Sequence, residues 1–202
     1  MQWNAVEELS TMGVPLRFLF LLFLTLFSTL PTHLQASFSQ QSHIDLPSET
    51  HRSSQKQTHL HFFYHDLRIA NNPSTIVKIV DTPKNVPNRF GSTFVMDDPM
   101  TEGPDLSSKP VGRAQGLFGL ASLNDLGMYM LINFAFTEGD YAGSSLSMVG
   151  RNPVAEQNRE MPIVGGTGVF RFATGYAIAN SMYDISSPEH FVMEYNVTVR
   201  HG

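Results

Sequence analysis

A strict two-residue alternation near the C-terminus constrains the fold of this 202-residue chain more than any other feature. From Phe191 to Arg200, apolar side chains occupy every second position, and all intervening side chains except Val192 are polar or charged. Successive side chains of a β-strand point to opposite faces. The segment is therefore predicted to be a half-buried antiparallel strand, with one face in a core and the other in water.

Shorter segments of extended character precede this strand and are separated by Gly, Pro and Asn. They are Leu60–Leu67, Thr75–Val80, Phe94–Met96, Met128–Phe136, Ser144–Val149 and Val169–Tyr176. No convincing amphipathic helix follows residue 59. Seven or eight short strands of this kind predict an all-β sandwich or barrel, and a closed barrel of about eight strands can hold one small ligand.

The N-terminal segment has the order of a secretory signal peptide. Arg17 precedes an apolar run from Phe18 to Leu30, and small Ala36 closes a candidate cleavage site. The run is shorter than the about 20 residues that a membrane-spanning helix needs. We expect a signal peptide over 1–36, against the alternatives of a buried helix or an N-terminal anchor. Translation from Met12 would give a cleaner signal, so the start stays open.

Composition divides the rest of the chain and excludes several kinds of chemistry. Residues 37–58 are rich in Ser, Gln, His and Thr and are predicted to form a disordered polar tail, which leaves 59–202 as the folded domain. The absence of cysteine excludes disulfides, thiolate metal sites and cysteine nucleophiles. A net charge of −5 opposes nucleic-acid binding.

Several ordered motifs between 59 and 202 are together specific. They are Phe63-Tyr64-His65-Asp66, the stretch from Asp97 to Asp105, the stretch from Ser108 to Gly116, Gly143-Ser144-Ser145-Leu146, Gly150-Arg151-Asn152-Pro153, the stretch from Arg159 to Gly168, and the stretch from Glu194 to Val199. With these motifs the domain resembles the plant dirigent family over almost its whole length. The resemblance implies a closed, eight-stranded antiparallel β-barrel with a central ligand cavity.

The same resemblance implies a function. Dirigent proteins direct the stereochemistry of phenoxy-radical coupling of monolignols such as coniferyl alcohol to lignans, with radicals supplied by a separate oxidase such as a laccase. Some relatives instead cyclise quinone methides. The resemblance also implies no cofactor, a secreted protein of the plant cell wall and apoplast, and a homo-oligomer, trimer or dimer. No membrane contact is expected after signal cleavage.

Asp66 is the first candidate catalytic residue. It lies in phase with Phe62 and Tyr64, which we expect to contact substrate, so its carboxyl would face an apolar cavity. Desolvation would raise the pKa of Asp66, and a neutral carboxyl can act as a general acid or hydrogen-bond a quinone-methide oxygen. The alternative is a strand-end Asp that accepts hydrogen bonds from nearby backbone N–H groups.

Arg159 is the second candidate, because it matches the family's arginine before Glu-Met-Pro. Its guanidinium could stabilise negative charge developing on a phenolic oxygen; the alternative is a salt bridge with Glu160 or Asp140. Two departures from the family pattern fall at expected substrate-binding positions. Asn152 replaces an Asp, so one acid of a proposed pair is missing, and Phe118 replaces a Tyr and loses the hydroxyl.

The remaining motifs have structural interpretations. Asp97 and Asp98 before Pro99 are interpreted as turn-capping residues, against the alternatives of a cation site or an acid–base pair. The stretch from Gly165 to Gly168 is interpreted as a β-turn, since it lacks the Lys and helix of a phosphate loop.

Two further motifs bear on metal binding and modification. His59, His61 and His65 share a strand face opposite Tyr64 and lack a nearby Glu ligand, so we expect no metal. Asn196 lies in an N-glycosylation sequon, and modification and an unmodified strand residue both stay open.

Three functions therefore compete. The first is a stereo-directing auxiliary of radical coupling, which needs no redox group of its own and which the resemblance favours over a classical enzyme. The second is an isomerase or lyase acting on a quinone methide, with Asp66 as acid and Arg159 as its oxyanion partner. The third is a non-catalytic phenolic-binding barrel.

Overall fold

The computed structural model describes residues 38–43, 55–68 and 74–202, which belong to the compact unit Ser37–Gly202. The predicted signal peptide lies outside the described residues. Short 3-10 turns occur at Pro87–Arg89, Gly139–Tyr141 and Gly168–Phe170. The strands are β1 (Ser39–His43), β2 (Lys56–Leu67), β3 (Ile76–Val80), β4 (Thr93–Thr101), β5 (Pro110–Leu120), β6 (Gly127–Phe136), β7 (Ser145–Pro153), β8 (Arg159–Thr167), β9 (Thr174–Ser181) and β10 (His190–His201).

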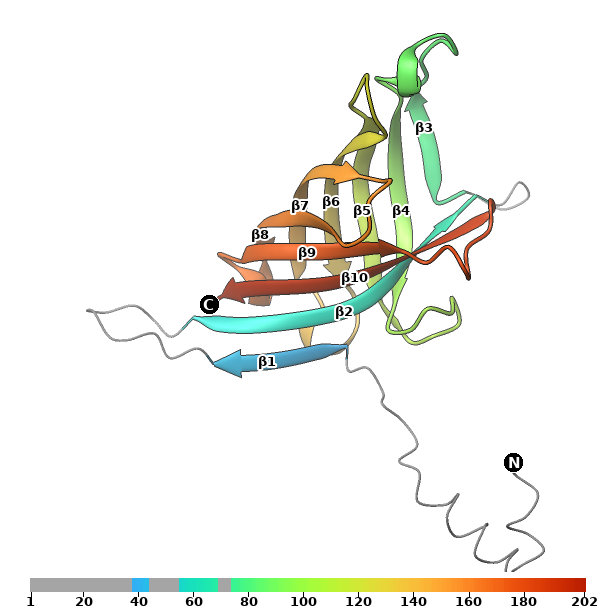
Figure 1. Ribbon diagram of the computed structural model, residues 1–202. Helices are drawn as coiled ribbons and strands as arrows, with labels where there is room; N and C mark the ends of the chain where they lie inside the picture. The colour runs from blue at the N-terminus through green and yellow to red at the C-terminus, as the bar shows by residue number, and fades with distance from the viewer. Residues whose placement is uncertain (1–37, 44–54, 69–73) are drawn as a thin grey trace, which may run out of the picture. The chain divides into compact units, whose positions relative to one another are not determined.

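The strands form a closed antiparallel barrel, which confirms the predicted fold. Hydrogen bonding runs in the order β2, β10, β9, β8, β7, β6, β5, β4, and β4 pairs again with β2 (Figure 1). Eight strands therefore close the ring. β1 continues the sheet beyond β2, and β3 lies against β4 where β2 has separated from it.

The C-terminal alternation has the predicted structural consequence. β10 pairs with β2 over the whole length of both strands, from Lys56 opposite His201 to Leu67 opposite His190. Tyr195 points into the barrel and is fully buried, whereas its neighbour Asn196 is exposed on the outside.

Aromatic side chains fill one half of the barrel interior. The ring of Phe62 lies 5.0 Å from that of Phe134 and is stacked 5.8 Å from that of Tyr195. Phe136 and Phe170 extend this cluster, with ring centroids 5.5 Å apart. The other half of the barrel contains a cavity, which methionines, further aromatic rings and polar residues line.

The polar tail predicted over 37–58 is wrong in part. Ser39–His43 forms strand β1, and β2 begins at Lys56 rather than at residue 59. Composition missed β1 because strand pairing uses backbone groups: Phe38 O accepts a hydrogen bond of 2.7 Å from His61 N. The ring of Phe38 also lies 6.4 Å from Phe62, against the core.

The turn predicted at Asp97 and Asp98 is also wrong, because β4 continues through both residues to Thr101. Pro99 lacks a backbone N–H and is tolerated only at unpaired strand edges. That edge of β4 pairs with β3 only as far as Met96 and with β2 only from Met100, so Pro99 lies in the gap.

Three further expectations change with the structure. No strand was predicted at β5 or β8, whose residues were identified only as parts of motifs. The turn expected over Gly165–Gly168 begins only at Gly168, which has a left-handed φ of 59°. The predicted strand Val169–Tyr176 is instead the end of a 3-10 turn followed by β9.

Candidate functional site

A cavity of about 200 Å³ occupies the open half of the barrel. Four methionines and three aromatic residues form almost half of its wall, most of the remaining lining residues are polar or charged, and side chains from every strand of the ring contribute. The lining residues are Tyr64, Asp66, Arg68, Ile76, Met96, Asp98, Phe118, Met128, Met130, Asn152, Val154, Arg159, Ser181, Phe191 and Met193. Five of the six predicted catalytic and substrate-binding residues therefore meet at one site.

Phe62 is the exception, because it does not line the cavity, and its assignment to substrate binding stays a prediction. It shares a strand face with Tyr64 but lies one residue pair deeper, where its ring is fully buried against Phe134 and Tyr195. Phe62 belongs to the aromatic cluster that packs below the cavity.

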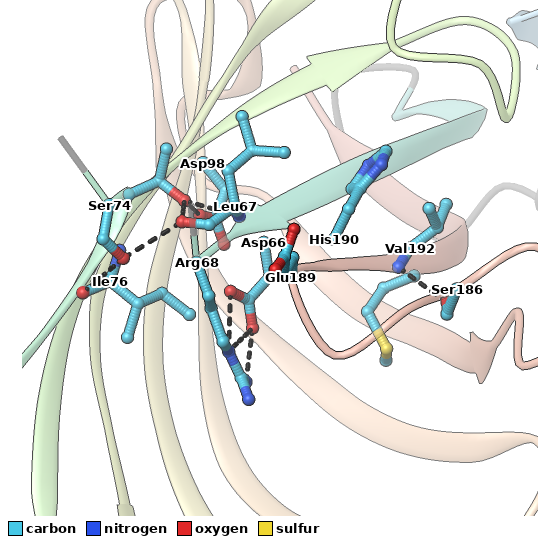
Figure 2. A network of polar contacts seen from close by, with 12 residues as sticks. Asp66, Leu67, Arg68, Ser74, Ile76, Asp98, Ser186, Glu189, His190 and Val192 are labelled. Carbon is cyan, nitrogen blue, oxygen red and sulfur yellow. Dashed lines mark hydrogen bonds and ion pairs between the residues drawn. The ribbon is translucent and has the colours of Figure 1, made fainter. Parts of the chain in front are cut away.

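Asp66 lies on β2 with 5% of its surface exposed. As predicted, burial raises the pKa of its carboxyl, but Arg68 opposes that shift. Arg68 Nη2 donates to Asp66 Oδ2 at 2.6 Å and Arg68 Nε to Oδ1 at 3.1 Å (Figure 2). Strand alternation did not predict this clamp, because Arg68 follows the last residue of β2.

Asp98 brings a second carboxyl to the cavity. It is fully buried on β4, in phase with Met96 and Met100. Burial raises the pKa of Asp98 to about 8, with nearby Asp66 adding to the shift and a hydrogen bond from Thr75 opposing it. The alternation of Met96, Asp98 and Met100 could have revealed this residue, had Pro99 not suggested a turn.

The two carboxyls face each other across the seam that closes the barrel. The last ladder pair of this seam is Tyr64 with Met100, and continuing its register by two residues places Asp66 opposite Asp98. Thr75 enters the opened seam, with its backbone N donating to Leu67 O at 2.9 Å and its O accepting from Asp97 N at 2.9 Å. The strand that follows, β3, takes the place of β2 beside β4.

Arg159 is among the most buried large side chains, with 1% of its surface exposed. No carboxylate among the described residues pairs with it, so the salt bridge to Glu160 or Asp140 that stood as the alternative interpretation does not form. Nη1 donates to Val154 O at 3.2 Å and Nη2 contacts Met193 Sδ at 3.7 Å, whereas Nε has no partner in this part of the chain.

Asn152 on β7 and Phe118 on β5 also line the cavity. Asn152 is buried on β7, and its Oδ1 has no hydrogen-bond partner among the residues described. Phe118 stacks on Phe94 with ring centroids 4.9 Å apart, which fixes the ring at the cavity. The structure thus places both departures from the family pattern at the site.

Two phenols separate the carboxyls from the aromatic core. The rings of Tyr64 and Tyr195 stack 5.2 Å apart. Burial raises the pKa of Tyr195 to about 12 and that of Tyr64 well above its ordinary value. Both hydroxyls therefore remain protonated and available as hydrogen-bond donors at physiological pH.

The histidines of β2 face away from the cavity and bind other side chains. His59 Nδ1 lies 2.9 Å from Thr198 Oγ1, His61 Nε2 lies 2.9 Å from Glu194 Oε1, and His65 Nε2 lies 2.7 Å from Thr101 Oγ1. Within 38–43, 55–68 and 74–202, no group of three or more His, Asp or Glu side chains could hold a metal ion.

A closed antiparallel barrel with an internal cavity that combines apolar walls with a few buried polar groups is typical of small-ligand-binding barrels. The sequence model described as Dirigent-like protein matches residues 57–200. This chain therefore belongs to the dirigent-like protein family.

Curated relatives and solved structures agree with that assignment. Dirigent protein 11 of Arabidopsis thaliana is 45% identical over 148 residues, covering 72% of this chain and 75% of the relative. Pterocarpan synthase 1 of Glycine max is 44% identical over 147 residues, or 71% and 78% of the two chains. A solved pterocarpan synthase dirigent protein superimposes with a TM-score of 0.66 at 40% identity, over 72% and 96% of the chains.

Proposed function

We propose that this barrel binds a phenolic quinone methide in its cavity and controls the stereochemistry of its cyclisation. One observation carries the proposal: three buried polar atoms of cavity-lining residues, on Asp98, Asn152 and Arg159, have no hydrogen-bond partner among the described residues. Such atoms carry a free-energy cost unless a ligand pairs with them. Their apolar surroundings fit an aromatic skeleton with a few oxygens.

The chemistry needs proton transfer and charge stabilisation, which the site can supply. During ring closure, a hydroxyl of the substrate adds to the methide carbon and a C–O bond forms. The quinone carbonyl oxygen gains electron density, which the buried Arg159 guanidinium stabilises, and then takes a proton from a cavity carboxyl. The attacking hydroxyl loses one proton while the carbonyl oxygen gains one, so the composition of the substrate is unchanged. The reaction is therefore an isomerisation without net oxidation. Relatives named pterocarpan synthases support this assignment.

Stereo-directed coupling of monolignol radicals is the second candidate, supported by relatives named dirigent proteins. In that case a separate oxidase, such as a laccase, is the partner that makes the radicals. The cavity of about 200 Å³ is smaller than the roughly 300–1,000 Å³ of a drug-sized pocket. It therefore suits one small phenolic skeleton better than two held side by side.

Chiral chromatography separates the candidates in two arms. In the first arm, the purified protein receives a quinone methide that carries a neighbouring hydroxyl, without oxidant. In the second arm, it receives coniferyl alcohol and a one-electron oxidase. We expect an enantiomeric excess in the first arm. An excess in the second arm alone would establish radical coupling, and racemic products in both at saturating protein would leave only a phenolic-binding role.

We also propose that copies of this chain associate through the outside of the barrel. Val77, Val95, Leu117, Leu131 and Val149 are neighbours in register across β3 to β7 and form one apolar row. Leu131 is 42% exposed and Val77 57% exposed. A contiguous exposed apolar row is typical of an interaction surface. We expect Leu131→Glu to convert a trimer or dimer to monomer in analytical ultracentrifugation.

Secretion to the apoplast and cell wall is proposed from the N-terminal segment and the family. Asn196 lies exposed on the outer face of β10, accessible to glycosylation. Among the described residues, no helix is long and apolar enough to cross a membrane. Mass spectrometry of the secreted protein tests both proposals, through its N-terminus and through a glycan that Asn196→Gln removes.

A further inference from the structure

The two carboxyls at the barrel seam are not equivalent, and their contacts differ in kind. Asp66 binds a guanidinium through both oxygens. Asp98 accepts one hydrogen bond, from Thr75 Oγ1 to its Oδ1, and its Oδ2 has no partner among the described residues. Two carboxyls in one buried site cannot both ionise at low cost, so one of them retains a proton.

Arg68 decides which carboxyl loses its proton. Its positive charge and two N–H donors stabilise the ionised form of Asp66. Asp98 has no cationic side chain bound to it, and its single donor is a neutral hydroxyl. The proton shared by the pair therefore resides on Asp98.

Thr75 decides which oxygen of Asp98 carries that proton. Leu67 N donates to Thr75 Oγ1 at 3.0 Å, and the Thr75 hydroxyl donates to Asp98 Oδ1, with only a longer contact of 3.5 Å to its other acceptor, Leu67 O. Because Oδ1 accepts this bond, the carboxylic proton lies on Oδ2. Oδ2 is the oxygen without a partner, so its O–H is free to be donated to a ligand.

We propose that Asp98 is the proton donor of this site and Asp66 its proton acceptor, with Arg68 and Thr75 as the positioning residues that fix these roles. The assignment rests on the proposed quinone-methide function. It reverses the role that the sequence suggested for Asp66, and it supplies the second acid that Asn152 cannot provide.

The proton balance closes within the site. Asp98 Oδ2–H passes its proton to the quinone carbonyl oxygen, while the attacking hydroxyl passes its proton to the Asp66 carboxylate as the new C–O bond forms. No electrons are gained or lost. The proton then returns to Asp98 by exchange with water at the mouth, where the Arg68 side chain is 55% exposed.

The first experiment measures turnover of the quinone methide by full-length variants. We expect Asp98→Asn to lower kcat by about a hundredfold or more, the range of general acid catalysis, with KM little changed. Asp97→Asn is the matched control, because this neighbour on β4 points outward and pairs with Arg113 at 2.7 Å. Full turnover by Asp98→Asn would overturn the assignment, whereas absence of turnover by the wild type would overturn the proposed function.

The second experiment tests the clamp by its effect on the pH profile. Removing Arg68 takes a positive charge from Asp66, so we expect Arg68→Gln to move the acid limb of kcat upward by about one pH unit or more, and Arg68→Lys to restore part of the shift. Arg151→Gln is the control, because Arg151 is as exposed as Arg68 but pairs with the exposed Asp125 outside the cavity. An unchanged acid limb would exclude a positioning role.

The charged and titratable groups around Asp98 bear on this profile. They are Asp66 and Arg68 across the seam, Arg113 on β5, and Asp97 beside it on β4. Tyr64 faces both carboxyls from β2, and Tyr195 faces Asp98 from β10. Both tyrosines remain neutral through the working range, so the acid limb reports Asp66 and the alkaline limb reports Asp98.

A third measurement does not depend on turnover. Carbon NMR of protein labelled at the aspartate carboxyls should show one buried group that titrates near neutral pH. We expect Asp98→Asn to remove this signal and Asp66→Asn to leave a protonated group in place. Loss of the signal in Asp66→Asn and its persistence in Asp98→Asn would assign the proton to Asp66 and overturn the proposal, even if the wild type proved inactive.

Discussion

Asp98→Asn should make the protein more stable at neutral pH. The pKa of Asp98 is about 8 in the folded state, against 3.8 for an unperturbed side chain. The unfolded chain therefore releases the proton between these values while the folded chain keeps it, so folding stability falls as pH rises from 3.8 towards 8. Asparagine retains the acceptor for Thr75 Oγ1 but has no proton to lose.

The size of the effect follows from the same two values. Each pKa unit corresponds to about 1.4 kcal/mol, so the variant should gain about 1.4 kcal/mol over the wild type per pH unit across this window. At pH 7 the difference reaches about 4 kcal/mol, a large share of the 5–15 kcal/mol that typically stabilises a domain. Near pH 4 the two proteins should differ little.

Urea unfolding measured by far-UV circular dichroism, at several pH values from 4.5 to 7.5, gives this difference in unfolding free energy directly. Asp97→Asn provides the control, since Asp97 is 54% exposed and its pKa is lowered rather than raised; this variant should not gain stability with rising pH. Parallel stability curves for Asp98→Asn and wild type would refute the argument that Asp98 is held protonated in the fold.

Three further predictions concern other parts of the barrel. Burial and neighbouring His190 lower the pKa of His65 from 6.5 to about 4. As pH falls from 6.5 towards 4, the unfolded chain therefore takes up this proton before the folded chain does, and folding stability decreases. His65→Gln should make the unfolding free energy less dependent on pH in this range. A Cβ at Gly116 would lie 1.9 Å from Leu131 O, whereas one at Gly165 would meet nothing within 4 Å; Gly116→Ala should prevent folding or lower the melting temperature sharply, and Gly165→Ala should do neither. Arg159→Met should leave the unfolding free energy equal to the wild type or higher, because a buried guanidinium without a carboxylate partner gains little from ionic contacts; a loss above about 2 kcal/mol would show that its contacts stabilise the fold.

Alternation in the sequence predicted which face a side chain occupies but not how deep it lies along the barrel. Phe62 and Tyr64 have the same phase, and both were assigned to the substrate site. Only Tyr64 reaches the cavity, because Phe134 and Tyr195 from other strands fill the space beside Phe62. That depth depends on the stagger of strands distant in sequence, which no local pattern contains.

The sequence did not reveal the roles of Asp98 and Arg68, for two other reasons. Asp98 was interpreted as a turn residue because Asp and Pro are typical of turns, yet the paired edges of β3 and β2 leave a gap that accommodates Pro99. The clamp between Arg68 and Asp66 follows the end of a strand, where alternation ceases to be a guide. Conversely, strand alternation predicted Asp66, and the family resemblance predicted Arg159, Asn152 and Phe118; all four residues line the cavity.

The central claim is that the cavity holds the quinone methide with its carbonyl oxygen at the buried Arg159 guanidinium, and that this orientation controls the stereochemistry of ring closure. The most direct test is the enantiomeric excess of the cyclised product formed by wild type, Arg159→Leu and the exposed-site control Arg151→Leu, with no oxidant present. We predict a strong excess with wild type and control, and racemic product with Arg159→Leu. An excess that Arg159→Leu retains in full would contradict the account, because the selectivity would then arise outside this cavity.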